Sequence, residues 1–177
     1  MTTVFFDIDT QLDFLLPAGA LYVPGAERII PLLAALNRHA AAHGIPLVST
    51  VDAHAEDDPE FRSWPAHCVA GTLGQRKPEE TRVPGQIVFE KVTLNAFEHP
   101  GFPALLDRLD AGRCVVYGVV TEVCVRFAAL GLLASGRRVE VVADAVKEFS
   151  APDRDAFLAA FTAAGGVLTS SASILGL

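Results

Sequence analysis

The chain alternates strand-length apolar runs with segments of helical spacing, and this alternation constrains the fold more than any other feature of the sequence. The apolar runs are continuous and rich in β-branched residues, as in residues 114–120 (CVVYGVV). Such runs are typical of strands that are buried on both faces, as in a parallel sheet covered by helices. We therefore predict an α/β fold: a three-layer, Rossmann-like domain with a mostly parallel sheet of about six strands.

The individual elements follow from the same patterns. Strands are expected at 3–8, 46–51, 87–90, 113–118, 138–143 and 166–169, and helices at 27–43, 102–110, 122–135 and 152–164. Residues 52–86 are polar and rich in Pro and Gly, and so long a loop in a compact domain is usually functional. The length of 177 residues suits a single domain spanning 1–177.

Charge and composition exclude several classes of partner. The 14 basic and 21 acidic residues give a formal charge of −7, and no basic cluster is present, so nucleic acid is not expected to bind. No apolar run approaches the roughly 20 residues of a membrane span. With 51% hydrophobic residues, the chain is not expected to be disordered. The apolar tail at 172–177 could pack internally or on a partner subunit, which leaves a homo-oligomer open.

The N-terminus and the cysteines indicate a cytoplasmic location. Asp7, Asp9 and Asp13 stand where a signal peptide would need a basic start and an uncharged apolar run. The three cysteines cannot all pair, and an odd number without an export signal indicates reduced thiols. Cys114 lies inside an apolar run and is expected to be an inert core residue.

Four chemically capable groups follow four of the expected strands. Asp9 follows the first strand, Asp52 and His54 follow the second, Lys91 ends the third and Cys124 follows the fourth. Ligands bind beyond the carboxyl ends of strands in open parallel sheets, so these groups are expected at one edge. Each also has a structural explanation, because strand-end acids cap turns, lone lysines are solvated and lone cysteines are often buried.

Cys124 has the strongest individual case. Thr121 is predicted to cap the helix that follows, which leaves the Cys124 amide among the free donors of the first turn. The positive end of the helix would lower the pKa of the thiol and favour a thiolate. With Asp9 to move protons and Lys91 to stabilise both anions, the set is suited to acyl transfer.

A second group of side chains has the composition of a metal site. Asp52 and His54 are two residues apart on an extended segment and can share a cation, with His67 and Glu60 further along the same loop. Imidazole and carboxylate ligands together suit Zn²⁺, Fe²⁺ or Mn²⁺. Ordinary loop polarity is the alternative, because Asp57 and Asp58 show that the loop is acidic in any case.

These residues fall in motifs that resemble a known family, the isochorismatase-like cysteine hydrolases, and most closely its nicotinamidase branch. The family pattern has D-x-Q-N-D-F, D-x-H, W-P-x-H-C-V-x-G-T, a strand-end Lys and G-x-x-T-x-x-C-V in this order. The chain has DTQLDF at 9–14, DAH at 52–54, WPAHCVAGT at 64–72, Lys91 and GVVTEVCV at 118–125. The resemblance covers nearly the whole chain.

The resemblance implies a role for each matched position. Asp9, Lys91 and Cys124 match the catalytic triad, and the peptide between Val119 and Val120 matches a cis bond that aims the Val120 amide, with that of Cys124, at an oxyanion. A divalent transition metal is implied, zinc first and iron or manganese as alternatives. The matched ligands are Asp52, His54, His67 and, as in some members, Glu60. The substrate is implied to be a small amide, nicotinamide in the first place, with its ring against Phe14, Trp64 and Phe97.

Three alternatives remain. Leu12 and Val120 replace the Asn and Ala common in the family, so the substrate could be another small amide, such as a ureido or carbamoyl compound. Residues 4–12 also match the first motif of haloacid-dehalogenase-type phosphatases, in which Asp7 would be the nucleophile, Asp9 the acid and Asp144 a late acidic residue. The third alternative is a non-catalytic binding module, against which the intact triad argues.

Overall fold

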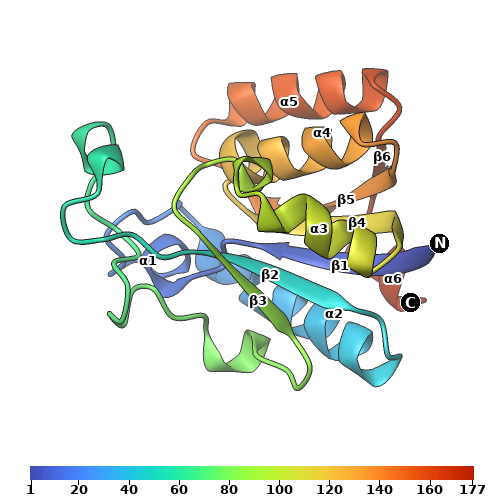
Figure 1. Ribbon diagram of the computed structural model, residues 1–177, viewed down its shortest axis with the longest axis horizontal. Helices are drawn as coiled ribbons and strands as arrows, with labels where there is room; N and C mark the ends of the chain where they lie inside the picture. Colours follow the sequence, from blue (N-terminus) through green and yellow to red (C-terminus); the bar gives the residue numbers. More distant parts are fainter.

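A single six-stranded sheet organises the chain in the computed structural model, which describes residues 1–177 (Figure 1). The strand order is β3-β2-β1-β4-β5-β6, and every neighbouring pair is parallel. The predicted α/β fold with about six strands is confirmed. The strands are β1 (Thr2–Ile8), β2 (Leu47–Asp52), β3 (Ile87–Lys91), β4 (Ala111–Val119), β5 (Arg138–Lys147) and β6 (Val167–Thr169).

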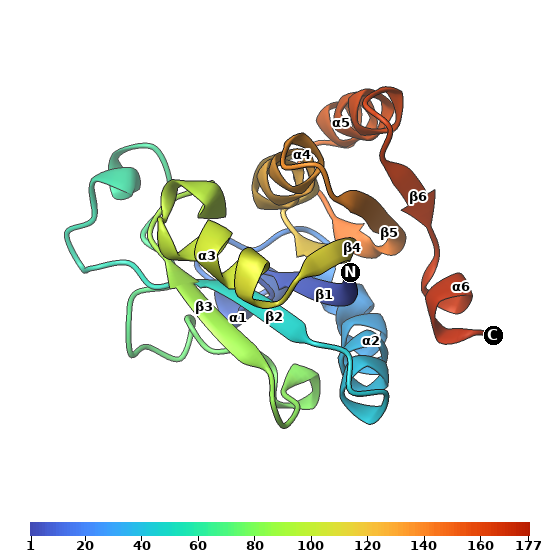
Figure 2. The ribbon, with the colours of Figure 1, turned by 45° about the vertical axis from the view of Figure 1, so that its right-hand side comes forward.

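Helices cover both faces of the sheet. They are α1 (Leu12–Leu15), α2 (Ile30–Ala42), α3 (Gly101–Arg108), α4 (Arg126–Ala134), α5 (Ala151–Ala163) and α6 (Ser171–Leu175). Helices α3, α4 and α5 lie on one side, and α2 and α6 on the other (Figure 2). Alternate residues of β1 enter the two cores, Phe6 with Phe102 and Phe5 with Leu33. Burial on both faces explains why the strands are continuous apolar runs.

The sheet has a switch point between β1 and β4. From β1 the chain proceeds outward to β2 and β3, and then returns to place β4 on the other side of β1. Ligand sites in such folds lie in the crevice at this point, beyond the carboxyl ends of the strands. Gly118 lets the two strands approach, because a Cβ there would lie 2.2 Å from the Ile8 carbonyl oxygen.

Several elements differ from their predicted bounds. A 3-10 turn, Ala26–Ile29, precedes α2, which begins with Pro31 in its first turn. Strand β5 runs to Lys147, four residues beyond the prediction, because an irregularity after Val116 lets β4 resume pairing with it. The helix expected at 122–135 is a π-helical turn, Thr121–Val125, followed by α4.

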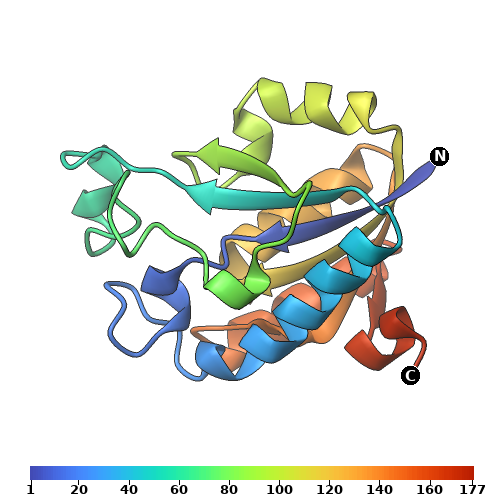
Figure 3. The ribbon, with the colours of Figure 1, turned by 90° about the horizontal axis from the view of Figure 1, so that it is seen from below.

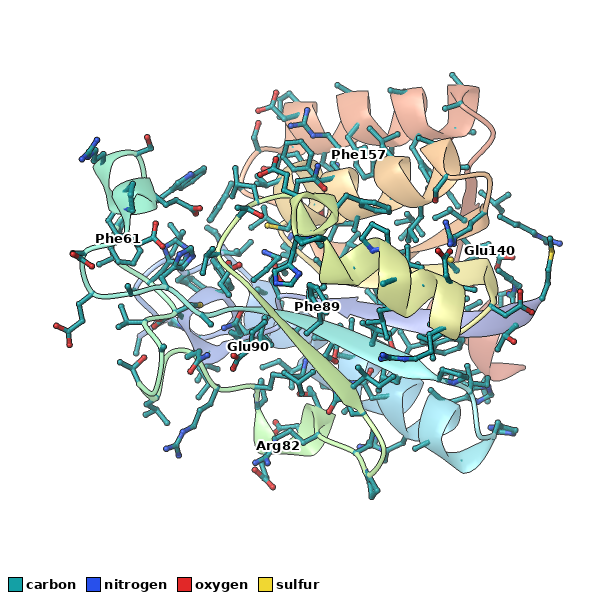
Figure 4. The ribbon with its side chains drawn as sticks, in the orientation of Figure 1. Phe61, Arg82, Phe89, Glu90, Glu140 and Phe157 are labelled. Atoms are coloured by element: carbon teal, nitrogen blue, oxygen red, sulfur yellow. The ribbon has the colours of Figure 1, made fainter.

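The 52–86 loop and the two termini lie at opposite ends of the molecule (Figure 3). The loop contains short 3-10 turns and one isolated β-bridge, and it extends beyond the carboxyl edge of the sheet, where Figure 4 shows Phe61. The apolar tail forms α6, and its Ile174 and Leu175 pack against the core beneath α2, so the tail packs internally. None of the helices has the length and apolar character needed to cross a bilayer.

Candidate active site

Lys91 lies between two carboxylates at the carboxyl edge of the sheet. Its Nζ is 2.8 Å from Asp9 Oδ2 and 2.5 Å from Asp52 Oδ1. All three side chains are buried. Burial works to lower the pKa of Lys91, but the charges of Asp9 and Asp52 and the hydrogen bond to Asp52 outweigh it and hold that pKa well above its ordinary value. Lys91 is therefore a buried ammonium ion, and not a lysine that is exposed to solvent at the end of its strand.

Asp9 is held in a fixed orientation directly after β1. Its backbone adopts a left-handed conformation with φ of 49°, and the Thr50 hydroxyl donates to its Oδ1 over 2.6 Å. Its Oδ2 pairs by charge with Lys91 and receives no hydrogen bond. One carboxylate oxygen is thus committed to the scaffold, while the other is free to accept a proton.

Cys124 lies in the π-helical turn that follows β4. The Val120 carbonyl accepts bonds from the amides of Val123 and Val125, and the Cys124 amide between them does not bond to that carbonyl. The peptide between Val119 and Val120 is cis, as the resemblance implied. The predicted cap is wrong: Val120 precedes the turn, and the buried hydroxyl of Thr121 has no partner. The sequence carried no sign that the helix begins with a π turn.

The Cys124 thiol is neutral at rest. Burial raises its pKa well above the ordinary value, and the nearby Asp9 and Asp52 carboxylates add to this, whereas only Lys91 lowers it. The sequence-based expectation of a lowered thiol pKa is therefore wrong, because it weighed the helix terminus without the loss of solvation. A thiol of this kind needs a base beside it before it can attack.

Asp52, His54 and His67 form a buried cluster whose ligand atoms all lie within 4.8 Å of one another. Glu60 closes a further side, since its Oε1 lies 4.0 Å from His54 Nε2 and 3.9 Å from His67 Nε2. Burial and the Asp9 charge raise the pKa of Asp52 to about 6, although Lys91 opposes this. Burial also raises the pKa of Glu60 and lowers that of His67.

Both histidines are oriented to offer Nε2 to the centre of this cluster. His67 Nδ1 donates to the Pro65 carbonyl over 2.7 Å, and His54 Nδ1 lies 3.0 Å from Asp58 Oδ2. The buried Nε2 of His54 has no partner among the protein groups. A buried unpaired nitrogen among carboxylates fits a divalent metal, and the outer partners fix the ring tautomers that ligation requires.

Asp58 is a site residue that sequence reasoning missed. The sequence shows it only as one of several acids of a polar loop. Its Oδ1 accepts from the Glu60 amide over 2.8 Å, while its Oδ2 holds His54. The amide of Glu60 and the neighbouring His54 keep the pKa of Asp58 below its usual range. The sequence signal for this contact is the spacing of four residues between His54 and Asp58.

The first motif also holds the loop in place. Gln11 donates to the Asp52 carbonyl and to the Gln75 carbonyl, over 2.7 and 2.9 Å, and accepts from the Asp52 amide. Asp13 accepts from the Cys68 amide over 2.7 Å, next to His67. Residues 54 and 69 form a single β-bridge. Together these bonds bring His67 opposite His54.

A small cavity lies beside both clusters, with an empty volume of about 270 Å³. Its lining includes Cys124 and Val120 from the turn and Asp52, Glu60 and His67 from the metal-type cluster. The predicted substrate residues Phe14 and Trp64 also line it, but Phe97 does not. The Phe97 ring instead packs on Phe102, with 5.1 Å between ring centroids, and against Gly131. Sequence reasoning missed four lining residues: Leu21, Leu94, Val123 and Phe149.

The phosphatase alternative fails on the positions of its two further acids. Asp7 is fully buried and bonded by Lys77 at 2.6 Å and by Asn37 at 2.8 Å. The Asp144 carboxylate accepts two bonds from Ser171. Both carboxylates therefore serve the scaffold.

Comparisons with known proteins define the class. Residues 3–173 match the isochorismatase domain, and the chain belongs to the isochorismatase family. It is 29% identical over 157 residues to the isochorismatase family protein PncA of Bacillus subtilis (strain 168), an alignment that covers 81% of this chain and 85% of that protein. The chain is thus an enzyme of a hydrolase family, and its solved relatives include amidases.

Two solved structures are similar over nearly their whole length. The pyrazinamidase of Pyrococcus horikoshii, in complex with zinc, superimposes with a TM-score of 0.87 at 30% identity, and the match covers 96% of this chain and 99% of that one. The N-carbamoylsarcosine amidase of Thermoplasma acidophilum gives a TM-score of 0.85 at 26% identity and covers 97% of both chains.

Proposed function

We propose that the protein is a metal-dependent amidohydrolase that converts nicotinamide into nicotinate and ammonia through a thioester on Cys124. One observation carries the proposal: a cysteine beside a carboxylate and an ammonium opens onto the same small cavity as a buried imidazole and carboxylate cluster. A nucleophile can attack only a carbonyl carbon that is held beside it, so both clusters serve one substrate.

Asp9 and Cys124 carry the proton and the nucleophile. Asp9 Oδ2 takes the thiol proton, and the sulfur attacks the carboxamide carbon to form a tetrahedral oxyanion. The amides of Val120 and Cys124 donate to that oxyanion. Asp9 returns the proton to the departing nitrogen, ammonia leaves, and a thioester remains. Asp9 then takes a proton from water, whose oxygen attacks the thioester. Asp9 passes this proton to the departing sulfur, which restores the thiol, and the product acid loses its proton to solvent to give the carboxylate.

Lys91 lowers the free-energy cost of the proton transfer from Cys124 to Asp9. Proton transfer from Cys124 to Asp9 creates a thiolate in a buried site, where an uncompensated charge is costly. The ammonium of Lys91 stabilises that anion without moving, because Asp9 and Asp52 hold it in place.

Asp52, His54 and His67 would hold the metal, with Glu60 on a further side. When bound there, a divalent ion supplies a Lewis acid that orients a substrate ring nitrogen. Zinc is the first choice, because the donors suit it and the similar pyrazinamidase structure contains it. Iron and manganese accept the same donors.

The cavity supports a small flat substrate. Phe14 and Trp64 offer aromatic faces to a ring, and eight of the eleven lining residues are hydrophobic.

Three unpaired cysteines agree with a cytoplasmic location, which is part of the proposal.

Another small amide is the second candidate. The similarity to N-carbamoylsarcosine amidase favours an open-chain carbamoyl compound. Two residues differ from the common family residues: Val120 lines the cavity, and Leu12 follows Gln11, which holds the backbone of Asp52.

Ammonia release tests the two candidates together. The purified protein is assayed with nicotinamide, pyrazinamide and N-carbamoylsarcosine, with chelator and after zinc is restored. We expect the two ring amides to be hydrolysed, with activity lost on chelation and regained with zinc. Preferred hydrolysis of the carbamoyl compound would establish the second candidate, and activity that is unchanged by chelation would remove the metal from the proposal.

A further inference from the structure

Glu122 ties the turn that carries Cys124 to the loop between β5 and α5. Its Oε1 accepts two backbone hydrogen bonds, from the Phe149 amide over 2.9 Å and from the Ser150 amide over 2.8 Å. Glu122 stands two residues before Cys124, so one carboxylate joins two segments that lie 27 residues apart in the sequence.

Phe149 is the residue that this tie brings to the cavity. Its side chain lines the cavity together with Cys124 and Trp64. The rings of Phe149 and Trp64 are stacked, with 6.0 Å between their centroids and 23° between their planes. The two aromatic residues come from the β5–α5 loop and the 52–86 loop, so the wall that they form depends on how each loop is held.

The amides of Phe149 and Ser150 find their acceptor in Glu122, whereas the Ser150 carbonyl accepts from the Arg154 amide of α5. Strand β5 ends at Lys147 and α5 begins at Ala151, with Ser150 as its capping residue. Backbone amides bonded to a carboxylate are held more strongly than by a neutral acceptor. A carboxylate is also favoured at the N-terminus of a helix such as the 13-residue α5. Removing it leaves two amides without their acceptor.

We propose that Glu122 is a positioning residue that fixes Phe149 against Trp64, and that the resulting aromatic wall selects flat ring amides over open-chain amides. A planar ring gains from an ordered aromatic face, whereas an open-chain carbamoyl compound gains little from it. The inference rests on the proposed amidase function and adds a determinant of substrate class to it.

A purely structural role for Glu122 makes different predictions. If Glu122 only stabilised the start of α5, its loss would lower stability without changing the environment of Trp64 or the preference between substrates. Asp153→Asn is the matched control, since Asp153 is an exposed acid in the first turn of α5 that does not bond to the Phe149 or Ser150 amides.

Fluorescence tests the contact without any substrate. Trp64 is the only tryptophan of the chain and stacks on Phe149, so its quenching by acrylamide reports how far the Phe149 ring shields it from solvent. We expect Glu122→Ala to increase the quenching constant as much as Phe149→Ala does. Glu122→Gln, which keeps an acceptor oxygen, and Asp153→Asn should both resemble the unmodified protein. Unchanged quenching in a folded Glu122→Ala, or a Glu122→Gln that behaves like Glu122→Ala, overturns the proposal.

Kinetics then test selectivity. For nicotinamide, Glu122→Ala should lower kcat/KM by roughly tenfold, the scale of one aromatic contact, mainly through KM. Activity on N-carbamoylsarcosine and the alkylation rate of Cys124 should change less than about threefold. Because both residues act through one wall, Glu122→Ala combined with Phe149→Ala should be no worse than Phe149→Ala alone. Additive losses, or equal losses on both substrates, overturn the proposal.

Failure of the two proposals can be told apart. If the unmodified protein hydrolyses neither amide, the proposed function fails, and the quenching of Trp64 still decides whether Glu122 positions Phe149.

Discussion

Asp52 shares its carboxylate between Lys91 and the two histidines. Its Oδ1 lies 2.5 Å from Nζ of Lys91, while its Oδ2 lies 3.9 Å from Nε2 of both His54 and His67. The ammonium and the metal-type cluster are therefore joined through one buried side chain. Any change at Asp52 reaches both halves of the site.

Replacement of Lys91 by Met keeps most of the apolar stem and removes the charge between Asp9 and Asp52. We expect kcat/KM to fall at least about a hundredfold, the usual loss for one electrostatic group. The free energy of unfolding should fall by about 3 kcal/mol, because two buried carboxylates lose their cation. Amide hydrolysis and urea unfolding measure the two effects.

Lys147→Met is the matched control for that experiment, because Lys147 also ends a strand but is partly exposed and pairs only with Glu148. Near-normal turnover in Lys91→Met would reduce Lys91 to a structural residue.

Metal binding depends on His54. The unmodified protein should hold about one divalent ion per chain, and His54→Ala should lose most of it, because the unpaired Nε2 is removed from a three-ligand cluster. His43→Ala, at an exposed histidine of the chain, should keep the ion. Elemental analysis gives the content. Equal metal content in the two variants would refute the assignment.

Metal affinity should depend on pH in a definite direction. The pKa of Asp52 is raised to about 6, so below that pH the carboxyl carries a proton that a metal must displace. Burial lowers the pKa of His67, so its imidazole competes less for protons than an ordinary histidine and adds less to this dependence. Zinc affinity should therefore fall by about tenfold per pH unit below pH 6 and level off above it. Titrations at a series of pH values check this, and a flat profile from pH 5 to 7 would contradict it.

The three cysteines should differ in reactivity. Cys124 lines the cavity, whereas Cys68 and Cys114 have no exposed surface. Iodoacetamide should therefore label Cys124 first in the folded protein. Its rate should rise with pH well past neutrality, since burial raises the pKa of the Cys124 thiol. Peptide mapping identifies the labelled residue, and comparable labelling of Cys114 would count against the assignment.

The fold and the main clusters were predictable because they follow from chain-wide patterns. Continuous apolar runs indicate strands covered on both faces, and the carboxyl ends of parallel strands share one edge. This is enough to bring Asp9, Asp52 and Lys91 together. The direction in which the pKa of Cys124 shifts was not predictable, because it depends on how much solvent the folded site excludes.

The local contacts of the loops could not be predicted from the sequence either. Whether a helix begins with a π turn depends on how the chain packs after β4. The sequence alone therefore predicts a cap at Thr121. Phe97 and Phe149 are both aromatic residues near expected strand ends. Only the tertiary arrangement turns Phe97 toward Phe102 and brings Phe149, through Glu122, to the cavity.

The covalent intermediate tests the central claim most directly. The protein is mixed with nicotinamide, quenched in acid within the first turnover and examined by intact-mass and peptide mass spectrometry. The account predicts a transient mass increase of one nicotinoyl group on the peptide that contains Cys124, and no adduct and no ammonia from Cys124→Ala. Ammonia release that persists in Cys124→Ala, or an adduct on another residue, would contradict it.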